Sequence, residues 1–103
     1  MNRDGYVIRG PAGSIRIGGD ALSALVVTAA ELVDGIRVRR PRRGLGVSVT
    51  GGRARVELAL VARYGSALPG LGHAVQESVA TALNNSAGLE VESVDVAFEE
   101  LDL

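Results

Sequence analysis

A pair of adjacent glycines, Gly51-Gly52, separates two segments in which apolar residues alternate with polar or small ones. Residues 45–49 alternate with a period of two, which is typical of a half-buried strand. Residues 56–64 alternate in the same way but carry apolar residues on both faces, which favours an inner strand. Two glycines accept positive φ at both turn positions. The sequence therefore predicts a β-hairpin over residues 44–65, with its second strand inside a sheet.

Helical periodicity lies on both sides of this hairpin. Apolar residues recur at spacings of three and one between residues 22 and 33, which predicts one amphipathic helix. A second helix is expected to start near Pro69 and to stop at Gly88. A final strand then changes phase, and a bulge at Glu92-Ser93 would reconcile its two halves. The expected fold is α+β, a β-α-β-β-α-β sandwich with two helices on one face of a small, mostly antiparallel sheet.

The N-terminal residues are harder to place. Residues 1–13 contain several glycines and one proline around a short apolar patch, which suits a flexible N-terminal extension or an edge strand. Residues 14–17 alternate and predict a short first strand. We expect residues 14–103 to form a single domain. There is no apolar segment of membrane-spanning or signal-peptide length, so we expect a soluble, cytoplasmic protein.

The charges are divided unevenly along the chain. Residues 1–63 hold eleven arginines against five acids, a balance of +6, whereas residues 64–103 hold seven acids and no arginine, a balance of −7. The chain has no lysine and no cysteine. These absences exclude a Schiff-base lysine, a thiol nucleophile and a thiolate zinc site.

Five arginines cluster around Pro41, and their positions are Arg37, Arg39, Arg40, Arg42 and Arg43. The proline disfavours helix before it, so the cluster is expected on an exposed loop or at a strand edge. Guanidinium groups bind phosphate or carboxylate with two parallel hydrogen bonds. Candidate partners are nucleic acid, anionic lipid headgroups or an acidic protein surface; the alternative is a solvated loop. Three aromatic residues and a net charge of −1 disfavour nucleic acid.

The charge division suggests a hypothesis for self-association. In it, the arginine loop of one copy contacts the acidic last strand and tail of its neighbour. The acids concerned are Glu90, Glu92, Asp95, Glu99, Glu100 and Asp102. Such a contact joins two different surfaces and builds rings or open filaments.

The single histidine, His73, is a weak candidate for chemistry. It could pair with Glu77 one helical turn away, but two ligands do not hold a divalent ion firmly. A triad of Ser66, His73 and Asp95 lacks a nucleophile elbow. We therefore predict no catalytic residue, no metal and no cofactor.

Six segments in order resemble one protein family. They are Gly13-Ser-Ile-Arg-Ile, Ala29-Ala-Glu-Leu-Val-Asp-Gly-Ile36, Val61-Ala-Arg-Tyr-Gly65, Pro69, Val75-Gln-Glu-Ser-Val79 and Gly88-Leu-Glu-Val-Glu-Ser-Val-Asp-Val96. Together they resemble the bacterial alkaline shock protein family, also called the Gls-type general stress or envelope stress response family. The resemblance implies a small non-enzymatic α+β protein tied to cell-envelope homeostasis. Some members self-assemble and are held at the membrane by a small membrane-protein partner, and the family offers no catalytic residues to carry over.

Two functional hypotheses follow. The favoured one is a non-enzymatic envelope stress response protein that acts as a scaffold through self-association and a small membrane-anchor protein. Its expected location is the cytoplasm, peripheral at the inner face of the cell membrane, without direct insertion. The alternative is an anion-binding module that uses the Arg37–Arg43 loop to bind nucleic acid or anionic lipid.

Overall fold

The structure is a computed structural model and describes residues 5–40 and 44–103. Its eight elements, in chain order, are β1 (Tyr6–Gly10), β2 (Gly13–Ile17), α1 (Gly19–Glu31), β3 (Ile36–Val38), β4 (Gly46–Thr50), β5 (Arg53–Arg63), α2 (Leu68–Ala87) and β6 (Glu90–Asp102). The α+β class expected from the sequence is confirmed.

Strand β5 is the centre of the main sheet, as its two apolar faces predict. Strand β6 runs parallel to it along one edge, from the Arg53–Glu90 pair to the Arg63–Asp102 pair. The opposite edge is shared by two shorter antiparallel strands: β3 pairs with residues 60–62 and β4 with residues 53–57. Both edges of β5 are therefore occupied, while the outer edge of β6 pairs with no strand in the described residues.

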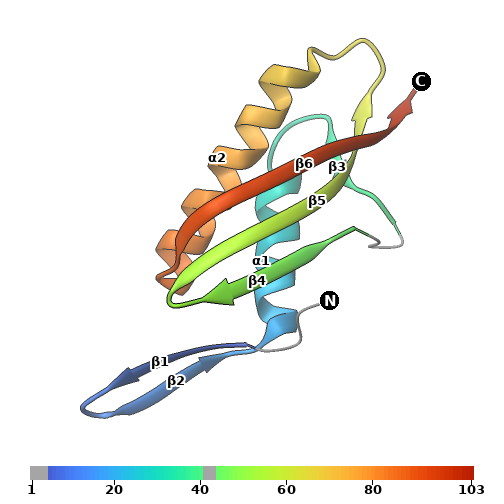
Figure 1. Ribbon diagram of the computed structural model, residues 1–103. Helices are drawn as coiled ribbons and strands as arrows, with labels where there is room; N and C mark the ends of the chain where they lie inside the picture. The colour runs from blue at the N-terminus through green and yellow to red at the C-terminus, as the bar shows by residue number, and fades with distance from the viewer. Residues whose placement is uncertain (1–4, 41–43) are drawn as a thin grey trace.

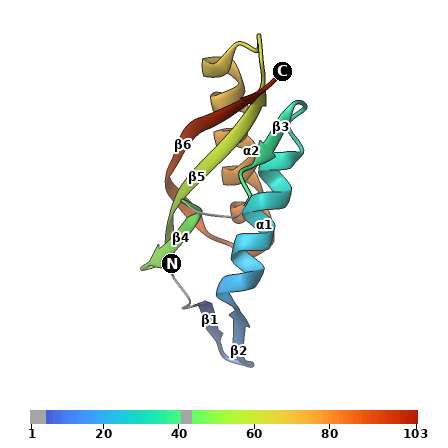
Figure 2. The ribbon, with the colours of Figure 1, turned by 90° about the vertical axis from the view of Figure 1, so that its right-hand side faces the viewer.

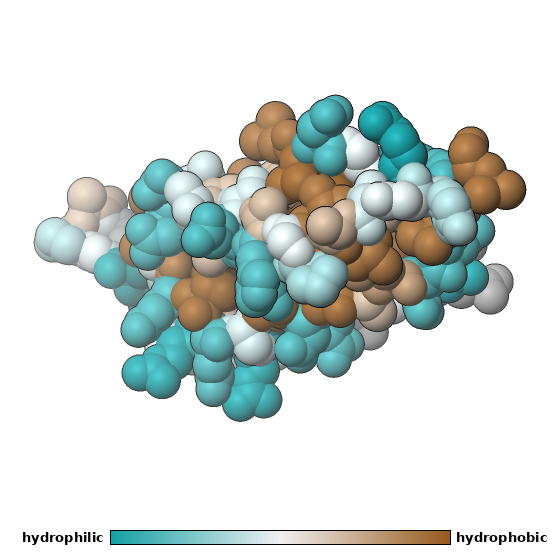
Figure 3. Space-filling model, turned by 90° about the horizontal axis from the view of Figure 1, so that it is seen from above, coloured by the Kyte–Doolittle hydropathy of each residue, from teal (hydrophilic) through white to brown (hydrophobic). Residues whose placement is uncertain are grey.

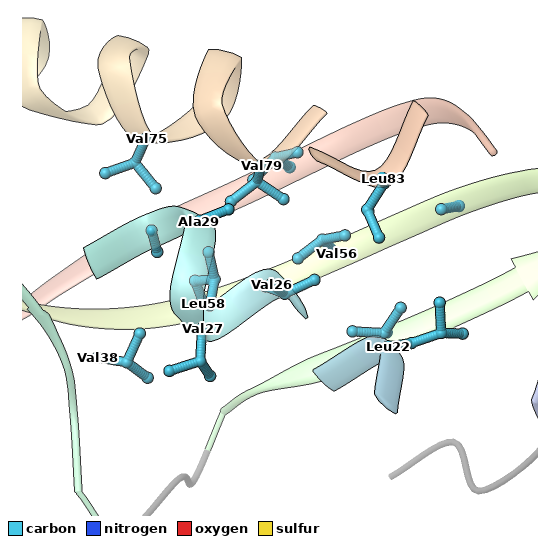
Figure 4. Close-up of a cluster of buried hydrophobic side chains, with 14 of the residues drawn as sticks. Leu22, Val26, Val27, Ala29, Val38, Val56, Leu58, Val75, Val79 and Leu83 are labelled. Atoms are coloured by element: carbon cyan, nitrogen blue, oxygen red, sulfur yellow. The ribbon is translucent and has the colours of Figure 1, made fainter. Parts of the chain in front are cut away.

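Both helices cover the same face of this sheet, so the molecule has two layers (Figures 1 and 2). Alternate residues of β5 point toward the helices and form the core with the apolar stripes of α1 and α2. Figure 4 shows Val26 of α1, Val79 of α2 and Val56 of β5 in one cluster. No polar or charged side chain is buried among the described residues, so hydrocarbon packing dominates the core.

One hydrogen bond joins the two helices. The Ser78 hydroxyl of α2 donates to the backbone carbonyl of Ala29 in α1 over 2.6 Å. Ala29 is 3% exposed, and its small side chain lets the two backbones approach closely enough for this bond. The bond fixes the position of α2 relative to α1 in addition to their apolar contact.

Three local sequence signals have the expected structures. Gly51 and Gly52 have φ of 57° and 75°, as a hairpin turn with two left-handed positions requires. Gly88 ends α2 with φ 67°, and its N–H donates to the Asn84 carbonyl. The register between β5 and β6 shifts where Val91 is followed by Ser93, so the bulge expected at Glu92-Ser93 is confirmed.

The N-terminal strands differ from the expected topology. The expected order placed residues 14–17 as the first strand of the main sheet, but β2 instead pairs with β1 in a separate two-stranded sheet. Strands β3, β4 and β6 occupy both edges of β5, so the central strand has no edge left for β2. The observed order is therefore β-β-α-β-β-β-α-β, and the β1–β2 hairpin spans the domain boundary expected at residue 13.

The β1–β2 hairpin projects beyond the rest of the molecule (Figures 1 and 2). Only its base is anchored, because Tyr6 and Ile17 pack against the core. The Tyr6 hydroxyl reaches the turn between β4 and β5, 3.9 Å from where a Cβ on Gly52 would lie. The projection gives the chain an elongated form, with extents of 52 × 23 × 18 Å.

Candidate interaction surfaces

The face of the sheet away from the helices carries the arginines that the sequence singled out. In β3, Ile36 and Val38 enter the core, so the alternation of the strand places Arg37 and Arg39 on the opposite, helix-free face. The exposed residues Arg53 and Arg55 of β5 lie on that same face. Arg37 lies within the edge strand β3, which agrees with the strand-edge alternative, and Arg39 directly follows that strand.

Two ion pairs cross the central strand on this face. Arg37 Nη2 lies 2.8 Å from Asp102 Oδ2, and Arg39 Nε lies 3.3 Å from Glu100 Oε2. The arginines belong to the β3 side of β5 and the acids to β6 on its other side. Each pair therefore reaches over β5 and links its two neighbours.

Two buried residues lie on the open face beneath or beside these crossing side chains. Ala59 and Val61 point away from the core cluster, yet they are only 7% and 2% exposed. Val61 lies in register between Arg37 and Glu100. The apolar stems of the arginines cover such small side chains while their charged ends stay in water. Short apolar residues at these positions leave room for the ion pairs above them.

A second set of ion pairs lies at the other end of β5 and β6. Arg55 donates two hydrogen bonds to the Glu92 carboxylate, at 3.0 and 3.1 Å, and Arg53 Nε lies 3.7 Å from Glu90. The hydrogen bonds and charge of Arg55 lower the pKa of Glu92 below its usual value. The same kind of contact with Asp102 raises the pKa of Arg37. These side chains remain exposed to solvent, so each ion pair contributes little to the free energy of unfolding.

A pH titration tests the Arg55–Glu92 contact. Because the folded pKa of Glu92 is lowered, its contribution to stability is present above the unfolded pKa and is lost as pH falls through the folded pKa. Arg55→Gln is expected to raise the pKa of Glu92 in a carbon-detected NMR titration. Arg63→Gln, at the far end of β5, is the matched control and should leave it unchanged. If the pKa of Glu92 is unchanged in Arg55→Gln, the contact with Arg55 is not what lowers it.

The other predicted residues divide into three groups. Arg40 lies 3.5 Å from Glu31, whose carboxylate also accepts the Val38 N–H at 3.0 Å. Arg42 and Arg43 lie outside the described residues. Asp95 and Glu99 form no ion pair within residues 5–40 and 44–103. The acids Glu90, Glu92 and Glu100 all pair inside one chain, so a contact with a neighbour's arginine loop requires exchange of these internal pairs.

The structure does not bring the weak catalytic candidates together. His73 lies on exposed α2 surface, and its Nδ1 is 3.3 Å from Gln76 Oε1. The triad partner Asp95 lies on the open face of the sheet, beside its register neighbour Glu57, whereas α2 covers the opposite face. No group of three metal-ligating side chains occurs in the described part of the chain.

Sequence reasoning missed a set of exposed apolar residues. The large apolar residues that stand most exposed in the described structure are Val7, Ile15, Leu32, Tyr64, Leu101 and Leu103. The first two lie on the projecting hairpin; the others lie at the opposite end, near the end of α1 and the ends of β5 and β6. Alternation around Val7 and Ile15 signals strands, but it does not reveal that no layer of the same chain covers them.

Comparisons with known proteins agree with the fold and identify the family. A solved structure of a MamM CTD variant in its zinc form superposes with a TM-score of 0.56 and 21% identity, covering 82% of this chain and 87% of that one. This likeness concerns the fold alone. No curated protein sequence matches the chain. In the described residues no helix is long and apolar enough to cross a membrane. Residues 9–103 match the model of the alkaline shock protein 23 family, described by a cell envelope-related function, and the chain belongs to that family.

Proposed function

We propose that this protein is a non-enzymatic scaffold of the cell envelope that acts through self-association. The observation that carries the proposal is the incomplete covering of the main sheet. Helices cover one face only, and the outer edge of the 13-residue strand β6 pairs with no strand in the described residues. Uncovered faces and strand edges are the surfaces through which proteins bind other chains.

The distribution of polar groups supports a non-enzymatic role. Side chains that perform catalysis are held in clefts where burial and neighbouring charges shift their pKa values. In the described residues every shifted pKa belongs to a solvent-exposed ion pair, either Arg37–Asp102 or Arg55–Glu92. The proposal places the protein in the cytoplasm, at the inner face of the membrane, held there by a small membrane-anchor protein. The family's cell envelope-related function supports this location.

Sedimentation velocity tests self-association directly. The protein is expected to sediment as species larger than a monomer, with the distribution shifting to larger species as concentration rises. Runs at low and high salt separate apolar from charged contacts, because salt screens exposed charges beyond about 10 Å at 0.1 M. A monomer at every concentration and at both salt levels would overturn the scaffold proposal.

The anion-binding alternative depends on the arginine cluster, and the ion pairs of that cluster weaken it relative to the scaffold proposal. Arg37, Arg39 and Arg40 each have a carboxylate of the same chain within 2.8–3.5 Å. A phosphate group would therefore compete with these carboxylates for the guanidinium groups. We expect a variant with all five clustered arginines replaced by serine to retain self-association. If that variant instead lost binding to nucleic acid or anionic vesicles that the wild type retains, the alternative would replace the scaffold proposal.

A further inference from the structure

The outer edge of β6 borders an apolar groove, which we call the α2–β6 groove. Its volume is about 310 Å³, and its apolar lining consists of Val96 and Phe98 from β6 with Leu68, Pro69 and Gly72 from the first turns of α2. The Phe98 ring lies 3.6 Å from where a Cβ on Gly72 would stand, so the ring packs directly against the helix. Figure 3 looks onto the end where α2 begins and β6 ends, and it shows hydrophobic residues at the surface among hydrophilic ones.

The backbone of β6 beside this groove is open to another strand. The side-chain amide of Gln76, in α2, donates to the Val94 carbonyl at 3.0 Å, so this carbonyl points away from β5. Peptide groups alternate in direction along a strand, which directs the N–H and C=O groups of Val96 and Phe98 the same way. In the described residues no strand pairs with this edge. A strand that added here would place alternate side chains in the groove and on the open face of the sheet.

The open face beside the same edge is acidic. Glu57, Asp95 and Glu99 are exposed and line a hollow of about 270 Å³ on that face. No arginine of the described residues lines this hollow or forms an ion pair with these three acids. The ion pairs of β6 lie on either side of it, at residues 90–92 and 100–102. The edge of β6 therefore fits a strand with one apolar face and one basic face.

The β1–β2 hairpin of this chain has such faces. Register pairs Ile8 with Ile15, and both lie on one face of the hairpin. The opposite face carries Arg9 and Arg16 together with Val7, and the hairpin contains no acid. Ile15 is 62% exposed, so no layer of its own chain covers the apolar face there. A two-stranded hairpin is marginally stable in water without a surface to pack on.

The hairpin does not reach the groove of its own chain. Its base lies beside the turn between β4 and β5, where the Tyr6 hydroxyl approaches Gly52. Strand β6 begins at that turn, because the Glu90 N–H donates to the Gly52 carbonyl at 3.0 Å. The groove lies farther along β6, with Val96 about 20 Å from Glu90 at about 3.3 Å per residue. The hairpin projects away from the body of the molecule (Figure 1), so its outer part is presented to a second copy.

A symmetric contact between two β6 edges is a weaker candidate. Pairing of β6 with its own copy would bring Asp95 and Glu99 beside the same acids of the neighbour. Like charges on adjacent strands are destabilising. The hairpin brings opposite charge to the same position, so the charges favour the hairpin over a second β6 strand.

We propose that the β1–β2 hairpin of one copy adds to the outer edge of β6 in the next copy. The inference rests on the proposed self-association and specifies its surfaces and its partner, a second copy of this chain. The isoleucines of the hairpin enter the α2–β6 groove, and its two arginines face Asp95 and Glu99. The contact joins two different surfaces, so the assembly is a head-to-tail chain in which each main sheet gains the strands of a neighbour.

Charge reversal tests the basic and acidic sides of this contact. The variant Arg9→Glu/Arg16→Glu makes the hairpin acidic. The variant Asp95→Arg/Glu99→Arg makes the edge of β6 basic. Each alone is expected to sediment as a monomer where the wild type associates, with its contact weakened more than about tenfold, because like charges then meet. Asp34→Arg, which reverses an exposed acid beyond the end of α1, is the matched control and should assemble like the wild type.

Mixing the two reversed variants gives the decisive result. The acidic hairpin of one fits the basic edge of the other, and the unchanged hairpin of the second fits the unchanged edge of the first. An equimolar mixture is therefore expected to recover wild-type assembly. If the wild type associates but the mixture stays monomeric, or if either reversed variant alone assembles like the wild type, the docking proposal is wrong while the scaffold proposal stands. A wild type that is monomeric throughout would overturn both.

Ile15→Ser tests the apolar side of the contact without changing any charge. In the otherwise wild-type chain it is expected to weaken assembly more than about tenfold. When both reversed variants carry it, their mixture should no longer assemble. Far-ultraviolet circular dichroism checks that every variant is folded. If the mixture with Ile15→Ser still assembles, general attraction between oppositely charged chains explains the recovery, and the docking proposal is overturned.

Arg42 and Arg43, which lie outside the described residues, are another source of positive charge. Arg42→Ser/Arg43→Ser is expected to assemble like the wild type, because the arginines of the hairpin face the acids of β6. If this variant were monomeric while Arg9→Glu/Arg16→Glu kept wild-type assembly, Arg42 and Arg43 would supply the contact instead of the hairpin. That result would overturn the docking proposal and leave self-association in place.

Discussion

Replacing Leu60 with alanine is expected to lower the free energy of unfolding by about 2–5 kcal/mol. Leu60 is fully buried in β5, where its register partners are Val38 on one side and Phe98 on the other. The substitution removes buried hydrocarbon and leaves a cavity at the point where β3, β5 and β6 meet. Urea unfolding followed by circular dichroism at constant protein concentration measures the loss.

Leu32→Ala is the matched control for this prediction. Leu32 is 76% exposed, and substitutions at such positions usually change stability by less than about 0.5 kcal/mol. The protein concentration must be low enough to keep both variants monomeric, because association also stabilises the folded state. Equal losses in the two variants would show that β5 is not the centre of the core.

Val79→Asp is expected to have a larger effect and to unfold the domain at neutral pH. Val79 is fully buried in α2 and faces α1 and β5 (Figure 4). The described residues offer no buried polar or charged side chain to pair with the introduced carboxyl. An unpaired buried charge costs several kcal/mol, a large part of a domain's total stability of about 5–15 kcal/mol.

The effect of Val79→Asp should depend on pH in a defined direction. Burial raises the folded pKa of the introduced carboxyl, so its penalty is smallest below the unfolded pKa of about 3.9 and grows as pH rises from there. Far-ultraviolet circular dichroism near pH 4 and at pH 7, each relative to the wild type, measures the difference as the folded fraction of the variant. Val79→Asn should show a penalty without this added pH dependence. A Val79→Asp penalty that is the same at both pH values would contradict the buried position.

The β4–β5 hairpin and the bulge in β6 could be predicted because their signals are local. Alternation and the Gly51-Gly52 pair specify the β4–β5 hairpin, and apolar residues on both faces mark β5 as the inner strand. The change of phase at Glu92-Ser93 locates the bulge before any partner strand is known. Each of these signals depends on residues within a few positions of one another, so the local backbone conformation follows from them directly.

The placement of the N-terminal strands and of the arginines depends on distant partners. Alternation at residues 14–17 predicts a strand but does not say which edge accepts it, and that edge is decided by β3, β4 and β6. Likewise, the sequence predicts that Arg37 is exposed, whereas its contact with Asp102 follows from the register of two strands on either side of β5. The alternation of apolar residues identifies which face of a strand is buried, whereas its neighbouring strand is identified only by the tertiary pairing.

The parallel pairing of β5 with β6 has a consequence for the synthesis of the chain on the ribosome. Arg53 is in register with Glu90 and Arg63 with Asp102. The second edge of the central strand is therefore covered only after residues 90–102 have been synthesised. Chains emerge at about 5–20 residues per second, so this edge stays accessible to other molecules for a few seconds. Long-range parallel pairing is also slow to form. Nascent β5 therefore presents an unpaired strand edge until β6 has been synthesised.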